Sequence, residues 1–101
     1  MAFRADNLHR MAGSGANSLW LYLDRDNDGA AVVDTAGYFA GDCPGMMRIG
    51  DIIIRVSASG WNANAGLPTG VGTAGFHVVM ANTGTQVNVS DTTALTVTNT
   101  D

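Results

Sequence analysis

The sequence has little of several features that define whole classes of protein. Among its 101 residues Cys43 is the only cysteine, so no disulfide can form within the chain. No apolar run approaches the roughly 20 residues of a membrane-spanning helix. Only 14% of the residues are charged and the net charge is −4, so there is no basic face for nucleic acid. These shortages favour protein partners over nucleic acid or membrane.

Residue groupings that perform catalysis are also missing. A nucleophile with a base, or two carboxylates in one pocket, occurs at no readable spacing. Asp51 stands in a Gly-Asp turn, where we expect it to bond nearby backbone N–H groups. His77 has no ligand or base near it, and Cys43 has no adjacent cation to activate its thiol. We therefore expect a protein that is not an enzyme.

The residues that are present are typical of one small β domain. Thirteen glycines and many Thr, Asn and Ser residues indicate polar turns between strands. We predict an all-β fold, a small antiparallel β-sandwich or barrel-like domain over residues 19–101. Residues 1–18 would form an extended N-terminal arm with at most a short helix, over Leu8 to Met11, and residues 30–33 a short return strand.

The β-branched run from Ile52 to Val56 is predicted to be the central strand. Side chains alternate between the two faces of a strand, so Arg55 and His77 would lie on the face that is partly wet. The opposite face would form the core, made of Leu21, Leu23, Ile52, Ile54, Val56, Phe76, Val78 and Met80.

Two segments are candidate interfaces. In the arm, Phe3, Leu8 and Met11 are apolar anchors that either dock onto a partner or fold back on the domain. Residues 58–74 form the longest irregular segment, and a loop of this length in a small domain is usually functional or disordered. Its large apolar residues are candidates for contact with a partner: Trp61, Leu67 and Val71.

An acidic loop follows the first clear strand. Asp24, Asp26 and Asp28 alternate before Gly29, which matches the first half of a calcium-binding loop. The twelfth position of such a loop, where a bidentate Glu belongs, holds Thr35. The alternative is an ordinary polar turn, because Asp, Asn and Gly are also common turn residues. The sequence therefore leaves two interpretations of the three aspartates, a Ca²⁺ site or an ordinary polar turn.

Several stretches together resemble small virion proteins of tailed bacteriophages. They are Asn17-Ser18-Leu19-Trp20, Val33-Asp34-Thr35-Ala36-Gly37-Tyr38-Phe39, Arg48-Ile49-Gly50-Asp51-Ile52-Ile53 and Val87-Asn88-Val89-Ser90-Asp91-Thr92-Thr93-Ala94-Leu95. The similarity is greatest to head decoration, or cement, proteins. It implies a homo-oligomer, with a trimer favoured, that is made in the host cytoplasm. It also implies a place on the outer capsid surface, against the major capsid protein.

A second function stays open beside that one. A head-spike or tail-fibre-like module would bind a receptor or glycan, with Trp61, Trp20 or Tyr38 as a stacking platform. Calcium in the acidic loop would stabilise such a module.

Overall fold

A computed structural model of the chain describes residues 3–13 and 16–99. Strands make up 48% and helices 12%, which confirms the all-β class. No helix in the described ranges is long and apolar enough to cross a membrane. The elements in chain order are η1 (Ala5–Asn7), β1 (Leu8–Gly13), β2 (Ser18–Asp24), α1 (Ala30–Val33), α2 (Cys43–Met46), β3 (Ile52–Asn62), β4 (Leu67–Asn82), β5 (Val87–Val89) and β6 (Thr93–Leu95).

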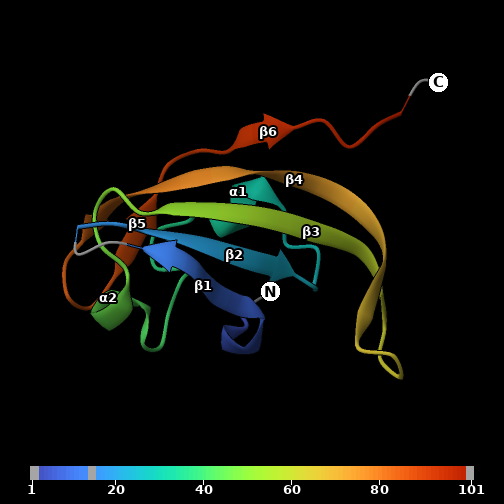
Figure 1. The fold of residues 1–101 in the computed structure, drawn as a ribbon, viewed down its shortest axis with the longest axis horizontal. Helices are drawn as coiled ribbons and strands as arrows, with labels where there is room; N and C mark the ends of the chain where they lie inside the picture. Colours follow the sequence, from blue (N-terminus) through green and yellow to red (C-terminus); the bar gives the residue numbers. More distant parts are fainter. Residues whose placement is uncertain (1–2, 14–15, 100–101) are drawn as a thin grey trace.

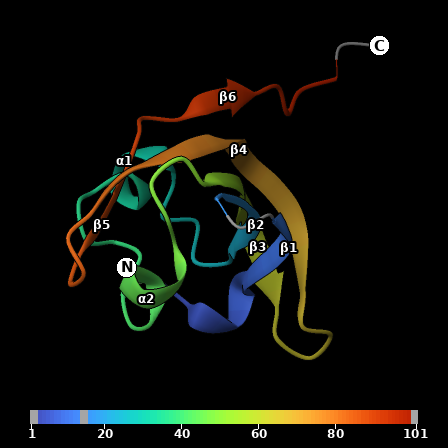
Figure 2. The ribbon, with the colours of Figure 1, turned by 60° about the vertical axis from the view of Figure 1, so that its left-hand side comes forward.

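The strands form one mixed sheet in the order β1-β2-β3-β4-β5, and β6 pairs with β4 (Figure 1). β3 is central, as predicted. Its pairing with β2 is parallel, whereas the other pairs are antiparallel. A parallel pair needs a long crossover, and residues 25–51 supply it. This crossover carries α1 and α2 along one side of the sheet (Figure 2).

The hydrophobic core lies on that side of the sheet and is rich in aromatic rings. The Phe3 ring lies 5.5 Å from the rings of both Tyr22 and Phe39, measured between centroids. Edge-to-face contacts join Tyr38 to the same group. The buried core residues are Trp20, Tyr22, Val33, Tyr38, Phe39, Cys43, Met47, Ile53, Val79, Val87 and Val89.

The predicted choice of buried face was wrong. Val78 is 41% exposed and Met80 60% exposed, whereas Ile53 and His77, on the other face, are fully buried. Both faces of β2 are apolar in sequence, whereas one face of β3 carries Arg55 and Ser57, so hydrophobicity favoured the wrong face as the core. The aromatic side is covered because the crossover packs on it, and its polar groups satisfy one another there.

Three local predictions also differ from the structure. Leu8 to Gly13 form a strand rather than a helix, because their backbone pairs with β2 and makes the arm part of the sheet. Residues 30–33 form the short helix α1 within the crossover instead of a return strand. Residues 58–74 are no irregular loop, because β3 and β4 continue through them as a hairpin with several register shifts.

Substitution of two adjacent isoleucines tests which face of the sheet is buried. Ile53→Asp should abolish folding, because an unpaired buried carboxylate costs several kcal/mol against a total stability of roughly 5–15 kcal/mol. Ile52→Asp is the matched control, since Ile52 is on the exposed face, and should stay folded. Circular dichroism and denaturant unfolding measure both. Similar loss of structure in the two variants would contradict the assignment of the buried face.

Candidate functional site

The side of the sheet opposite α1 and α2 carries three rows of apolar side chains. Residues paired across strands share a face, so the register places them beside one another. The rows are Ala12, Leu19, Ile52 and Val78; His9, Leu21, Ile54, Phe76 and Thr93; and Leu23, Val56, Ala74 and Leu95, so the only polar members, His9 and Thr93, lie at the two ends of the middle row. Met80 lies on the same face two residues beyond Val78. These residues, with Met80, are called the open face below, because α1 and α2 both lie on the other side of the sheet (Figure 2).

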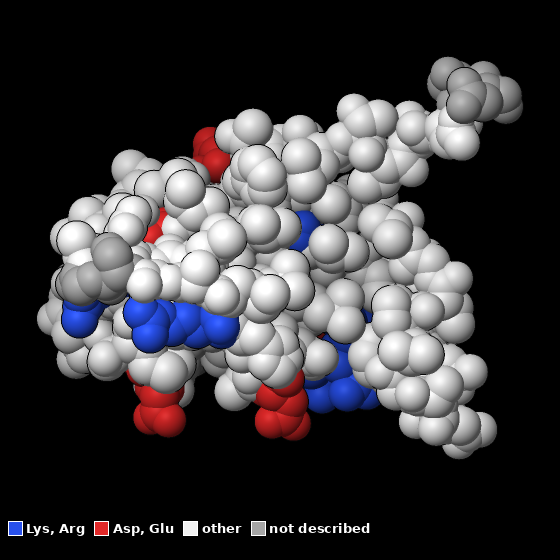
Figure 3. Space-filling model, viewed as in Figure 1, with Lys and Arg blue, Asp and Glu red and all other residues white. Residues whose placement is uncertain are grey.

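The open face carries little charge. Its one ionisable side chain is that of His9, on the edge strand β1. Figure 3 views the molecule from this side and shows mostly uncharged atoms, with a small blue patch near the middle, a blue band at the lower left, and red atoms at the upper left and along the lower edge. Contiguous exposed apolar surface of this kind usually marks an interaction site. The open face is therefore the first candidate site.

The second candidate is the far part of the β3–β4 hairpin. β2 ends opposite Ser57 and β6 pairs only as far as Ala74, so residues 58–72 continue as a two-stranded ribbon. Figure 1 shows this projecting ribbon extending beyond the other strands. Leu67 is 60% and Val71 51% exposed along it. The projecting ribbon thus presents apolar side chains on a narrow extension of the domain.

Local contacts hold the projecting ribbon in shape. Asn62 Oδ1 accepts hydrogen bonds from the backbone N–H groups of Asn64 and Ala65, at 3.1 and 3.2 Å. Gly66 closes the turn with a φ of 67°, which favours glycine. Near its tip Trp61 pairs with Pro68, and the Arg25 guanidinium lies 4.6 Å from the Trp61 ring centroid. Trp61 is half-buried, so it positions the ribbon as well as adding to its surface.

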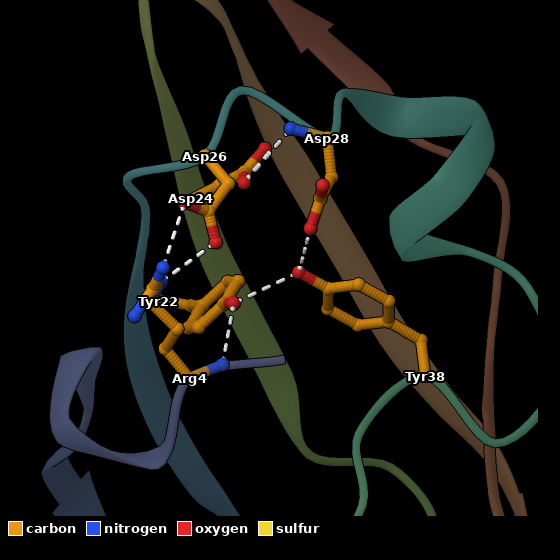
Figure 4. Close-up of polar contacts among 6 residues, drawn as sticks. All are labelled: Arg4, Tyr22, Asp24, Asp26, Asp28 and Tyr38. Carbon is orange, nitrogen blue, oxygen red and sulfur yellow. Dashed lines mark hydrogen bonds and ion pairs between the residues drawn. The ribbon is translucent and has the colours of Figure 1, made fainter. Parts of the chain in front are cut away.

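The three aspartates of the predicted calcium loop each have protein partners (Figure 4). Asp24 is buried and accepts from the backbone N–H groups of Asp28 and Gly29, both at 2.9 Å. Asp26 pairs with Arg4 through two hydrogen bonds, of 2.6 and 3.0 Å. This hydrogen bonding holds the pKa of Asp26 below its usual value. Two of the three carboxylates are thus already engaged.

The third carboxylate belongs to a chain of hydroxyl groups. Tyr38 donates to Asp28 Oδ2 at 2.6 Å, and the Tyr22 and Tyr38 hydroxyls are 2.8 Å apart. Burial raises the pKa of Tyr38, so the phenol stays a donor. Asp28 Oδ1 is buried without a hydrogen-bond partner. Calcium takes six to eight oxygen ligands, so this one oxygen does not make a calcium site. Among the described residues no group of three acidic, His or Cys side chains could hold a metal ion.

A second buried polar network lies beneath the middle of the sheet. Arg55 is fully buried, and its Nε donates to His77 Nε2 at 3.1 Å. His77 Nδ1 then donates to the Ser90 carbonyl at 2.9 Å, which defines a neutral ring with its proton on Nδ1. Arg55 also donates to Ser57, which in turn donates to Asp24. The sequence interpretation missed this network, because it placed Arg55 and His77 on a wet face.

Asp51 and Cys43 have the structural roles that the sequence predicts. Asp51 is buried and accepts from the Ser18 and Arg48 backbone N–H groups, at 2.8 and 3.0 Å. It also accepts from the Trp20 indole at 2.8 Å, a contact that the sequence did not reveal. Burial raises the pKa of the Cys43 thiol to about 11, so the thiol is protonated and unreactive at neutral pH.

The remaining predicted site residues fall into two groups. Phe3 and Leu8 pack against the domain's own core, so the arm folds back, the second alternative drawn from the sequence, and only Met11 is well exposed. Trp20 and Tyr38 are buried and cannot offer a ring face to a sugar. Trp61 has Arg25 over its ring.

Comparisons with known proteins give no match. The chain matches no protein family, no curated protein sequence and no solved structure.

His77 should make folding stability depend on pH. Burial, and to a lesser extent Arg55, hold the pKa of His77 below its ordinary value. In the unfolded chain the ring titrates near about pH 6.5, so the unfolded state takes up the proton first as pH falls. The contribution of neutral, buried His77 to the free energy of unfolding should therefore be complete above about pH 6.5. Below that pH the free energy of unfolding should decline.

Denaturant unfolding on both sides of this pH measures the effect. We expect the decline in the wild-type protein and in His9→Gln, an exposed control, and a clearly smaller decline in His77→Gln. If His77→Gln declines as steeply as the control, other groups cause the pH dependence.

Calcium should not bind the acidic loop, because Asp24 and Asp26 are already engaged. Calorimetric titration should give no binding heat at millimolar calcium, and the melting temperature should be the same with and without the ion. Heat that disappears in Asp28→Asn would instead establish a site around that carboxylate.

Proposed function

We propose that this chain is a structural protein of a tailed-bacteriophage particle, which binds the outer capsid surface and stabilises the shell. The observation that carries the proposal is the projecting ribbon with its exposed Leu67 and Val71. The capsid setting comes from the sequence resemblance, and the major capsid protein is the proposed partner.

The projecting ribbon suits contact with a large neighbouring surface. An isolated two-stranded hairpin is only marginally stable in water, so a partner that packs against it would add contacts that the domain lacks. Its large side chains are apolar, and burying one contributes about 1.5–3 kcal/mol. The ribbon joins directly onto the central strands, so contact at its end is transmitted to the rigid part of the sheet.

Stabilisation of a shell then follows from mass action. A protein that binds the assembled shell, and not its dissociated subunits, shifts the equilibrium towards assembly. Many equivalent copies add their effects over the surface. We propose a homo-oligomer on the particle, with a trimer as the arrangement that the resemblance implies, made in the host cytoplasm before it joins the capsid.

Quantitative mass spectrometry of purified particles tests the proposed role. The ratio of this chain to the major capsid protein should be near one if the protein decorates the whole surface. A handful of copies per particle would instead place it in a spike or tail and favour the receptor-binding alternative. Its absence from particles would refute the role.

The projecting ribbon can be tested with a double variant. Leu67→Lys with Val71→Lys should weaken binding to undecorated shells by at least about tenfold, since about 1.4 kcal/mol corresponds to that factor. Ile49→Lys is the matched control, because Ile49 is 64% exposed but lies outside the ribbon. Cosedimentation with shells measures binding. Equal binding of the double variant and the control would remove the ribbon from the mechanism.

A further inference from the structure

We propose that the open face is an interface between copies of this chain, and that a second copy covers it in solution. This inference goes beyond the capsid role, because it requires no shell and because two like faces meet as a pair rather than as the trimer that the resemblance implies. It stands on three properties of the open face: its chemistry, its area and the placement of charge around it.

The chemistry of the open face restricts what can cover it. Its three rows contain aliphatic side chains and Phe76, and their only hydrogen-bonding side chains, those of His9 and Thr93, lie at the two ends of the middle row. A partner that placed charged or polar groups against these rows would leave them desolvated and unpaired, which is unfavourable. A fitting partner therefore presents an apolar surface of similar extent. The open face of another copy is such a surface, and it is always present with the first.

The area suits a weak pair of copies. Four strands about 4.8 Å apart, with three rows about 7 Å apart, give about 400 Å² in flat projection. Side-chain relief adds to this value, and Val97 at 44% exposure continues the apolar surface beyond Leu95. Counted on both copies, the flat projection is about 800 Å², below the about 1,200 Å² at which stable specific interfaces begin, so we expect a weak pair that forms as the concentration rises. Two sheets also pack well face to face, about 10 Å apart, with their side chains interdigitated.

Charge placement removes the main obstacle to self-association. The chain has a net charge of −4, so two copies repel if their charged surfaces meet. The open face has no acidic side chain, and its one ionisable side chain, His9, lies on the edge strand β1. Copies that meet through their open faces therefore bury no carboxylate.

The test is the mass of the protein in solution. Sedimentation velocity of the full chain, over a wide range of concentration, should give a mass of more than one chain. Val78→Lys places a charge in an exposed position at the β4 end of a row and should reduce the mass to that of one chain. Leu67→Lys, on the projecting ribbon, is the matched control and should keep the wild-type mass.

Circular dichroism establishes that each variant is folded, and Met80→Lys, at a more exposed position, replaces Val78→Lys if the latter unfolds. A wild-type protein that is monomeric at every concentration overturns the proposal. So does an oligomer whose mass both open-face variants leave unchanged. If a monomeric protein binds shells and Val78→Lys abolishes that binding, the open face belongs to the capsid contact and the proposal is wrong. An oligomer that is absent from particles supports it while refuting the capsid role.

Discussion

The fold depends on the burial of Arg55 beneath the middle of the sheet. A guanidinium without water is costly unless its N–H groups find acceptors, and here they come from three separate parts of the chain. His77 and Thr73 on β4, Ser57 on β3, and Thr92 before β6 all accept from Arg55. Because these acceptors face the crossover, they determine which side of the sheet the crossover covers.

That choice determines what the other side is free to do. Side chains alternate along a strand, so directing Arg55 and Ile53 inward directs Ile52, Ile54 and Val56 outward. Gly75, opposite Arg55, allows the chain to return closely along the sheet, since a Cβ there would lie 2.9 Å from the Thr93 carbonyl oxygen. The tail then adds β6, and Leu95 completes the open face. A buried cation and an exposed apolar surface thus have one cause.

The sequence predicted more of the secondary structure than of its packing. The central position of β3 follows from its β-branched run, whereas the first half of β4 was predicted to be irregular. Leu19 to Leu23 has apolar residues on both faces, so alternation located the strand without distinguishing its sides. Only partners distant in sequence, such as the Asp51 carboxylate for the Trp20 indole, make the distinction.

The candidate site was predictable in composition but not in arrangement. Leu67 and Val71 were identified as exposed, yet their place on strands depends on cross-strand pairing that no local pattern reveals. Phe3 was identified as an anchor, but its fit between Tyr22 and Phe39 requires a core that exists only after folding. The open face was taken for the core, because aliphatic rows look alike whether the domain or a partner covers them.

The two proposed surfaces reinforce one another physically. Copies joined through their open faces carry two projecting ribbons, and where both ribbons reach the shell, the first to bind holds the second near its own site. The second contact is then intramolecular, and the combined affinity can exceed that of one ribbon by a factor of about 10² to 10⁴ without any new contact. Weak contacts by a small ribbon would then suffice for a stable coat. The open face would contribute to shell binding without touching the shell.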